Sequence, residues 1–427
     1  MLDIKLIRES PELVEKDLKK REDIEKIGML RELIILDEQK RNIIKKVEGL
    51  KHIRNNVTKK IAYMKKKGED VSKELMEIKG IPDKIKELDD KLAKLDEQCN
   101  DILMQLPNIL DESVPVGKDD RNNVEVRRWG VIPNFRFIPK NHFDIAIELG
   151  LIDAERAAKV SGHGFFYLKD RLALLDYSIQ RFAIDFLLKK GYILVQPPFM
   201  MHKEPCKGVT DLSAFEEVLY KIDGEDLYMI ATSEHPIAAM YMNEVIEQKN
   251  LPLKFIGISP CFRKEVGAHG KYTKGLFRMH QFHKIEQFIF CLPDQSWELH
   301  EELQKNSEEL YQALEIPYRV VNVCTGDIGN IAAKKYDTEC WMSDGHYREI
   351  GSNSNCTDYQ ARRLSIRYRE VEGQSPKGFV HTLNNTALAT SRVMVALLEV
   401  NQQEDGSVKI PRALWPYTGF KMIEKKI

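Results

Sequence analysis

The 427-residue sequence has no apolar run approaching the roughly 20 residues that a membrane-spanning helix needs. Its first residues, MLDIKLIRESPELVEK, carry acids and lack an apolar centre, so they do not form a secretory signal. They are typical of a short strand followed by a helix that Ser10 caps and Pro11 begins. These absences predict a cytoplasmic protein with no membrane partner.

Cysteine is scarce and scattered. The seven cysteines are an odd number, and no two have the CxxC spacing of a zinc knuckle. This usage indicates reduced thiols and excludes a disulfide framework. His280 and His283 of the HQFH segment would point to opposite faces of an alternating strand, so they cannot share a metal ion. The sequence therefore predicts no zinc site.

Net charge is nearly absent, at −1, but the charges are segregated. Residues 40–67 hold eleven Lys or Arg and one acid, Glu48, a balance of +10, which leaves about −11 for the rest of the chain. A basic strip of this kind is typical of a nucleic-acid contact. Its candidate contact residues are Lys45, Lys46, Lys51, Arg54, Lys59, Lys60 and Lys65.

Residues 29–106 have the apolar periodicity of two long helices separated by the polar break KKKGED. The pattern predicts an antiparallel helical hairpin with its tip near Gly68 and a kink at Pro82 in the second helix. A dimerising coiled coil with solvated lysines is the alternative. Such coils usually mix charges of both signs, whereas one helix here is almost purely basic, which favours a nucleic-acid-binding arm.

Residues 111–130 are rich in charge, contain proline and glycine, and have no periodicity, so they are interpreted as a linker. An amphipathic helix over about 172–186 follows, and then a strand that Pro197 and Pro198 stop. Short strands and isolated helices then alternate without βαβ rhythm, which predicts an α+β fold with a mainly antiparallel sheet flanked by helices. The predicted domains are 1–110, with the arm at about 29–106, and 131–427 after the linker.

The stretch FRKEVGAHGKYTKGLFRMHQFHKIEQF, residues 262–288, places charges in an apolar neighbourhood. If its two halves pair as strands, one face carries the guanidinium groups of Arg263 and Arg278, the ring of Phe282 and two carboxylates. Guanidinium groups bind phosphate oxygens in a bidentate manner, and a ring can stack on a base. GAHGKYT lacks the spacing and the following helix of a Walker loop. A solvent-exposed, salt-bridged hairpin is the alternative for this segment alone.

Three further segments carry candidate polar groups. In LYMIATSEHPIAAM, Thr232 and Glu234 would project to one side at the end of a strand, where they could hold an ammonium or a hydroxyl. YDTECWMSDGHYREIGSNSNC contains Glu349 and Ser352, and the carboxylate suits Mg²⁺. HTLNNTALATSRVMVALLE places Arg392 early in an otherwise apolar helix, where a buried cation needs an anionic partner.

Together, TSE, FRKE…GLFRMHQFHKIE, YREIGSNSNCTDYQARR and TLNNTALATSR closely resemble the class II seryl-tRNA synthetases, most of all the archaeal form. The resemblance covers nearly the whole chain, including the basic hairpin. It implies a six- to seven-stranded antiparallel catalytic sheet and a homodimer formed partly through residues 172–198. It also implies two reactions: serine and ATP give seryl-adenylate and pyrophosphate, and serine then passes to the 3′ end of tRNA-Ser, with tRNA-Sec a further candidate acceptor.

The resemblance also implies residue roles. For ATP, Arg263 would bind the α-phosphate and Arg392 the γ-phosphate, and these two arginines would be catalytic. Phe282, Met279 and Glu265 would surround adenine, and Arg278 would also bind ATP. Glu349, with Ser352, would lie in the Mg²⁺ region, with Glu349 as the metal residue. Serine would be bound by Thr232 and Glu286 at its ammonium, by Glu234 and Thr386 at its hydroxyl, and by Asn384 and Arg263. The hairpin would bind the long variable arm of tRNA-Ser.

Several positions depart from the family pattern. Tyr272 stands where an acid is common, Gly351 and Thr386 where Ser is common, and Asn385 where Gly is common. Two other functions remain alternatives. One is a catalytically silent paralogue that binds RNA, and the other is a paralogue that loads an amino acid onto another acceptor. The retained arginines and acids argue against the first, and the basic arm argues against the second.

Overall fold

A computed structural model describes residues 1–210, 215–265 and 275–425. The chain divides into two units, Met1–Pro107 and Asn108–Ile427. No helix of the described residues is long and apolar enough to cross a membrane. Within the first unit, the helices in chain order are α1 (Ile4–Glu9), α2 (Pro11–Lys20), α3 (Ile24–Lys66), α4 (Ser72–Ile78) and α5 (Ile81–Gln105).

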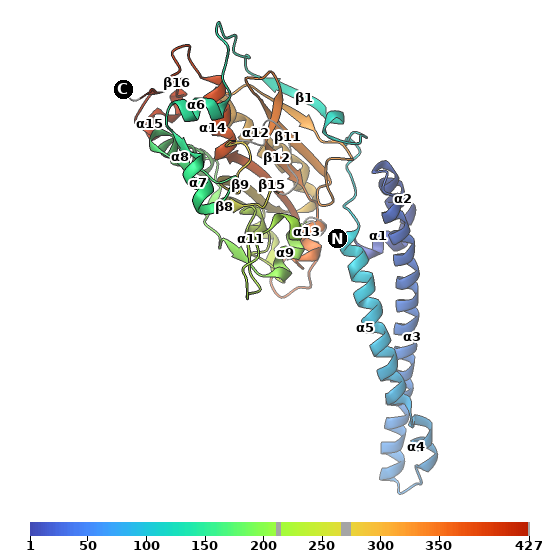
Figure 1. Ribbon diagram of the computed structural model, residues 1–427. Coiled ribbons are helices and arrows are strands. Elements are labelled where there is room, and N and C mark those ends of the chain that lie inside the picture. Colours follow the sequence, from blue (N-terminus) through green and yellow to red (C-terminus); the bar gives the residue numbers. More distant parts are fainter. Residues whose placement is uncertain (211–214, 266–274, 426–427) are drawn as a thin grey trace. The chain divides into compact units, whose positions relative to one another are not determined.

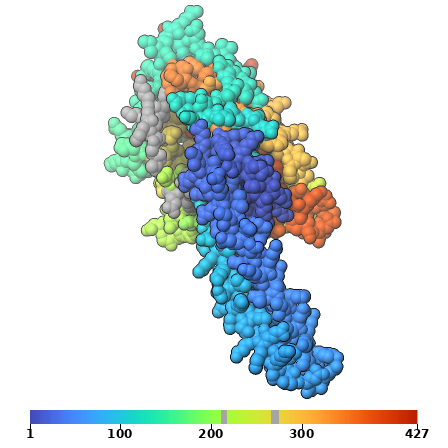
Figure 2. All heavy atoms as spheres, turned by 90° about the vertical axis from the view of Figure 1, so that its right-hand side faces the viewer, coloured from blue at the N-terminus to red at the C-terminus, as the bar shows by residue number. Residues whose placement is uncertain are grey.

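The helical hairpin predicted from the sequence is confirmed. α3 and α5 run side by side, and α4 lies at the end of the hairpin far from α1 and α2 (Figures 1 and 2). Apolar side chains along both helices, such as Val47, Ile61 and Ile85, are buried. Since helices this long have little other support, burial of this shared apolar seam is what holds the hairpin together.

Two local predictions for this unit were wrong. The expected N-terminal strand is helix α1, whose first turn is capped by Asp3, with its Oδ1 accepting from the backbone N–H of Lys5 at 2.8 Å. Pro82 does not kink a helix. It is the second residue of α5, which begins directly after Gly80, a residue with a φ of 85°. Proline is well tolerated in a first turn because its missing N–H would have no helical partner there.

The second unit is built on an eight-stranded sheet in the order β1-β10-β11-β12-β15-β9-β8-β4 (Figure 1). Neighbouring strands are antiparallel except β4 with β8, so the sheet has one more strand than expected and a parallel edge. The strands are β1 (Val124–Trp129), β4 (Ile193–Val195), β8 (Leu253–Phe262), β9 (Gln281–Cys291), β10 (Tyr318–Asn322), β11 (Lys334–Trp341), β12 (Tyr347–Asn355) and β15 (His381–Ala389).

Residues 111–130 are more ordered than a linker. β1 lies within them and pairs with β10 from Val124↔Asn322 to Trp129↔Tyr318. The ring of Trp129 stacks on that of Tyr318 at 5.9 Å. This strand was not predicted, because apolar alternation is confined to Val124 and Val126 and every residue of β1 is exposed.

The two faces of the sheet have different neighbours. Ile285 and Ile289 of β9 belong to a core that includes residues of the helices α8 (Asp170–Leu188), α12 (Ser296–Ala313) and α14 (Thr390–Val400). Phe288 and Phe290, of the opposite parity, belong to a second core with residues of α9 (Lys203–Val209), α11 (Glu234–Ala238) and α13 (Tyr359–Arg363). Since side chains alternate along a strand, Phe282, Lys284 and Glu286 share the second face.

Shorter elements complete the unit. Its remaining helices are α6 (His142–Glu148), α7 (Ala154–Ser161), α10 (Phe215–Val218) and α15 (Trp415–Thr418), with 3₁₀ turns at Asp120–Asn122, Gln248–Asn250, Pro293–Gln295 and Arg412–Leu414. The small sheets are formed by β2 (Ile152–Asp153) with β3 (Tyr167–Leu168), β5 (Met200–Met201) with β6 (Tyr228–Met229), β7 (Val245–Glu247) with β13 (Arg367–Arg369) and β14 (Gly378–Phe379), and β16 (Val408–Lys409) with β17 (Met422–Ile423).

Candidate active site

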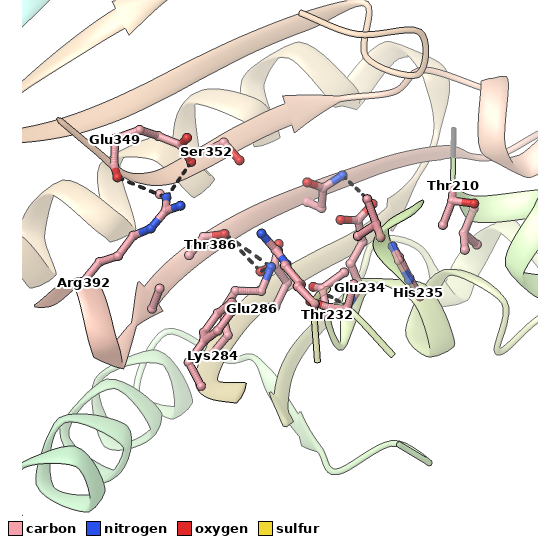
Figure 3. Close-up of a pocket in the computed structure, with 18 of the residues that line it drawn as sticks. Thr210, Thr232, Glu234, His235, Lys284, Glu286, Glu349, Ser352, Thr386 and Arg392 are labelled. Atoms are coloured by element: carbon pink, nitrogen blue, oxygen red, sulfur yellow. Dashed lines mark hydrogen bonds and ion pairs between the residues drawn. The ribbon is translucent and has the colours of Figure 1, made fainter. Parts of the chain in front are cut away.

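A cavity of about 340 Å³ lies over the ends of β8, β9, β12 and β15 (Figure 3). The predicted pairing of the two halves of residues 262–288 is confirmed, because Phe262 of β8 pairs with Gln281 of β9. The structure thereby brings together residues from five separate sequence segments. The predicted site residues that line the cavity are Thr232, Glu234, Arg263, Phe282, Glu286, Glu349, Ser352, Asn384, Thr386 and Arg392.

Glu286, which is 1% exposed, lies between the Arg392–Glu349 side of the cavity and the Glu234 side (Figure 3). Its Oε2 accepts a hydrogen bond from the hydroxyl of Thr386 at 3.2 Å and lies 2.5 Å from Nζ of Lys284. Glu286 and Thr386 are direct partners in the pairing of β9 with β15. This register is why two residues 100 positions apart are in contact in the cavity.

Glu234 begins α11, next to Thr232, whose hydroxyl accepts from the Glu234 backbone N–H at 3.2 Å. Oε1 of Glu234 accepts hydrogen bonds from Nε2 of Gln360 and from Nδ2 of Asn384, both at 3.2 Å. Burial, and next the nearby charge of Glu286, raise the pKa of the Glu234 carboxyl to about 7, although the charge of Lys284 opposes the shift. Glu234 therefore changes its charge near neutral pH.

Arg392, at the start of α14, has the anionic partner that its setting requires. Its Nη1 donates to the backbone oxygen of Glu349 at 3.0 Å and to Oε1 of that residue at 3.1 Å. Loss of water raises the pKa of the Glu349 carboxyl, but the charges of Arg392, Lys335 and Arg263 together outweigh this and lower it. Glu349 lies on strand β12, whereas the sequence indicated a turn-rich setting.

Two arginines of the cavity lie over aromatic rings. The guanidinium carbon of Arg263 is 5.3 Å from the centroid of Phe282, and that of Arg392 is 5.1 Å from the centroid of Phe277. Nε of Arg263 also donates to the backbone oxygen of Ala231 at 3.3 Å. These contacts hold both cations in place before any anion binds.

Three predicted ATP residues do not line this cavity. Strand β9 begins at Gln281, so Arg278 precedes it, and Nη1 of Arg278 pairs with Oε2 of Glu265 at 3.1 Å. Met279 is buried and lines an adjoining cavity of about 240 Å³, which shares Phe282 with the first. Tyr272 lies outside the described residues.

Several lining or supporting residues were not predicted. Lys284 lines the cavity and shares a face of β9 with Phe282 and Glu286, but the motifs assigned no role to it. His235 also lines the cavity, with a buried Nδ1 that has no hydrogen-bond partner among the described residues. Burial lowers the pKa of the His235 imidazole to about 3, so it is neutral. Gln360 is fully buried behind Glu234, and only the tertiary fold reveals that contact.

The departures from the family pattern have local explanations. Asn385 points away from the cavity, and its Oδ1 accepts from Nε2 of Gln287 at 2.8 Å and from the hydroxyl of Ser307 at 2.5 Å. At Gly351, an added Cβ would lie 3.0 Å from the backbone oxygen of Thr386 and 3.4 Å from its Cβ. The glycine therefore leaves room for the branched threonine beside it.

Comparison with known proteins gives two family matches and many full-length relatives. Residues 1–110 match the seryl-tRNA synthetase N-terminal domain, and residues 218–401 match the tRNA synthetase class II core domain (G, H, P, S and T). Serine–tRNA ligase of Methanocella arvoryzae is 54% identical over 98% of each chain, and that of Thermococcus sibiricus is 50% identical over 99% of this chain and 97% of the relative.

Solved structures agree. The crystal structure of seryl-tRNA synthetase from Pyrococcus horikoshii complexed with ATP matches with a TM-score of 0.96 and 48% identity, covering 100% of both chains. That of the cytoplasmic serine–tRNA ligase from Naegleria fowleri in complex with AMP matches with a TM-score of 0.89 and 39% identity, covering 100% of this chain and 99% of the other. The resemblance inferred from the sequence motifs is confirmed: the chain belongs to the seryl-tRNA synthetase family of class II aminoacyl-tRNA ligases.

Proposed function

We propose that the cavity over β8, β9, β12 and β15 is where this serine–tRNA ligase activates serine with ATP. The observation that carries the proposal is the charge set of one cavity, in which three carboxylates, Glu234, Glu286 and Glu349, face three cations, Arg263, Lys284 and Arg392. The ammonium group of an amino acid needs a carboxylate partner, whereas its carboxylate and the phosphates of ATP need cations. A site for both substrates therefore needs charges of both signs close together. Serine-dependent ATP–pyrophosphate exchange, followed by charging of tRNA-Ser, tests this assignment.

In the first reaction, a carboxylate oxygen of serine attacks the α-phosphorus, and the bond to pyrophosphate breaks. The serine carboxyl is already ionised, so this step needs alignment and charge neutralisation rather than a general base. Arg263 is assigned to the α-phosphate and the serine carboxylate, and Arg392 to the γ-phosphate. Adenine is assigned to the ring of Phe282, and Met279, Glu265 and Arg278 are proposed around it.

Glu349 and Ser352 suit a magnesium ion that arrives with ATP. Oxygen is the ligand atom that Mg²⁺ prefers, and such ions are commonly held by one or two carboxylates plus substrate phosphates. Glu349 fits this pattern, because its lowered pKa keeps it ionised and its side chain is 45% exposed. When bound, the ion would neutralise phosphate charge. Glu349 also holds Arg392 beside the same place, at 3.1 Å from its Oε1.

The other end of the cavity suits serine. Thr232 and Glu286 are assigned to its ammonium group, while Glu234 and Thr386, with Asn384, are assigned to its hydroxyl. Asn384 and Gln360 both donate to Oε1 of Glu234, which leaves Oε2 for the substrate. After activation, serine passes from the adenylate to a hydroxyl of the tRNA 3′ end, and AMP leaves.

Serine affinity is expected to depend on pH through Glu234. Its pKa of about 7 means that the carboxyl is neutral below that pH and ionised above it. An ionised acceptor hydrogen-bonds a hydroxyl more strongly. The KM for serine in pyrophosphate exchange should therefore fall as the pH rises, by about tenfold between about pH 6 and about pH 8, in step with the ionised fraction. A Glu234→Gln variant should lose this dependence, and an equally steep profile in that variant would contradict the assignment.

The arm formed by α3, α4 and α5 is proposed to bind tRNA-Ser. α3 carries the basic strip of residues 40–67, whereas α5 has four lysines and seven acids, a balance of −3. Lys45, Lys46, Lys51, Lys59 and Lys65 are exposed, and none forms an ion pair with another described residue. Lys60 differs, because its Nζ lies 2.9 Å from the buried carboxylate of Glu74 in α4.

Changing Lys51, Lys59 and Lys65 together to Glu is expected to impair charging of tRNA-Ser and to leave pyrophosphate exchange unchanged. Each lost phosphate contact should lower the salt slope of tRNA binding by about 1. Lys60 is kept, since a glutamate there would repel Glu74. The matched control changes the exposed Lys84, Lys86 and Lys94 of α5 to Glu. Equal tRNA affinity of the two triple variants across salt would rule out the α3 strip.

A homodimer and a cytoplasmic location are further parts of the proposal. Apolar side chains on α8 and the edge strand β4 stay exposed in the single chain, with Tyr177 at 65% and Ile193 at 54%. Such a patch beside an open sheet edge is typical of a subunit interface. The seven cysteines are all free and buried, which is compatible with a reducing compartment.

A further inference from the structure

The cavity contains a buried ion pair, and one of its members, Lys284, has no assigned substrate contact. Nζ of Lys284 lies 2.5 Å from Oε2 of Glu286, and the two residues are 5% and 1% exposed. The hydroxyl of Thr386 completes the group, 3.5 Å from the ammonium and 3.2 Å from the carboxylate oxygen. All three side chains line the cavity (Figure 3).

The place of Lys284 along β9 matches the order of the substrate groups. Phe282, Lys284 and Glu286 follow one another on the same face of the strand. Phe282 is the proposed support for adenine, and Glu286 is the proposed partner of the serine ammonium. Lys284 therefore lies between these two ends, where the serine carboxylate and the α-phosphate must meet. Arg263 reaches the same region from β8, with its guanidinium over the Phe282 ring.

Charge balance indicates what must happen to this pair. Serine is a zwitterion, so it brings no net charge into the cavity. Oε2 of Glu286 already has Nζ of Lys284 at 2.5 Å and the hydroxyl of Thr386 at 3.2 Å, so a substrate ammonium that binds this oxygen must displace Nζ. Once displaced, the lysine ammonium would be a buried charge without a partner, which is strongly unfavourable. The carboxylate of the same serine molecule supplies that partner.

We propose that Lys284 is a serine-binding residue, and that serine opens the Lys284–Glu286 ion pair. The substrate ammonium takes the place of Nζ on Glu286, and Nζ turns to the serine carboxylate beside Arg263. One ion pair is thus exchanged for two. The flexible four-carbon stem of lysine permits this small movement without a change in the strand. The inference rests on the proposed serine site.

This exchange makes the site selective for compounds that carry both charges. An amine without a carboxylate must break the same pair and leaves Lys284 without an anion. Serinol, which keeps the ammonium and the hydroxyl of serine but has no carboxylate, is the matching probe. Wild-type protein should bind serinol far more weakly than serine.

The test is calorimetric titration of Lys284→Met with serine and with serinol. Serine binding is expected to weaken by about 10–100-fold, the usual effect of losing one charged hydrogen-bond partner. Serinol binding is expected to tighten by about tenfold, since Glu286 no longer has a competing cation. The opposite signs identify the exchange, because a purely structural role for Lys284 would weaken both ligands. Parallel weakening, or unchanged serine binding, would overturn the proposal.

Three further variants complete the design. Lys254→Met removes another lysine–glutamate pair of this sheet, Lys254 with Glu302 at 2.7 Å outside the cavity, and should leave both affinities unchanged. Glu286→Gln should weaken both serine and serinol. If it does not, the serine site itself is wrong, which is a different failure from that of Lys284. If Lys284→Met does not fold, Lys284→Gln takes its place. The ratio of its affinities for serine and for serinol then shows whether the two ligands respond in opposite directions.

Discussion

Replacing Arg392 or Arg263 with alanine is expected to lower serine-dependent ATP–pyrophosphate exchange by about 10²–10³-fold, the usual loss when one preorganised donor is removed from a developing charge. Both guanidinium groups lie in the cavity and are held over aromatic rings before the substrate arrives. Because they are held in place, they stabilise phosphate charge without reorganisation. The effect should appear mainly in kcat, since the charge on the phosphate oxygens is redistributed in the transition state.

The two substitutions should differ in their side effects. Arg392→Ala also removes the partner of Glu349, so the pKa of that carboxyl should rise and the dependence on magnesium concentration should change. Arg263→Ala leaves the Arg392–Glu349 pair intact. A suitable control is Arg412→Ala, which removes an arginine 5.9 Å from the ring centroid of Trp415 outside the cavity. Near-normal exchange in either cavity variant, with the control also normal, would contradict the assigned phosphate roles.

The sequence was sufficient for features that depend on neighbouring positions. The arm could be predicted from the apolar periodicity of residues 29–106. This periodicity is a property of each helix's own sequence and does not depend on distant segments. The shared face of Phe282, Lys284 and Glu286 follows from the alternation of one strand. The identity of the cavity residues followed from the motifs, because each motif contributes one short segment to the site.

Features that depend on distant segments could not be predicted in this way. Gln360 lies 126 residues from Glu234, and their contact exists only because α13 packs beside α11. The Lys284–Glu286 pair and the hydroxyl of Thr386 meet through the register of β9 with β15. β1 is exposed along its whole length and has only a short apolar alternation at Val124 and Val126, so its pairing with β10 was needed to reveal it.

Discrimination between serine and alanine is expected to be large, about 10⁴–10⁵-fold in kcat/KM, because a site built to hydrogen-bond a hydroxyl is left with unpaired buried groups when that hydroxyl is missing. Glu234 and Thr386 are the groups concerned. Thr386 is 8% exposed, and Glu234 is held by the amides of Gln360 and Asn384, so neither can turn to solvent for a substitute partner. Alanine should therefore be a very poor substrate.

Glu234→Gln and Thr386→Val should each weaken serine far more than ATP and reduce the preference for serine over alanine. Threonine is the harder competitor, because one extra methyl group changes binding by only about 1–3 kcal/mol. An added Cβ at Gly351 would lie 3.0 Å from the backbone oxygen of Thr386 and press on that residue, so Gly351→Ala is the variant to compare for threonine activation. Pyrophosphate exchange with serine, alanine and threonine in parallel measures all three preferences. Efficient activation of alanine by the wild-type protein would contradict the assignment of Glu234 and Thr386 to the substrate hydroxyl.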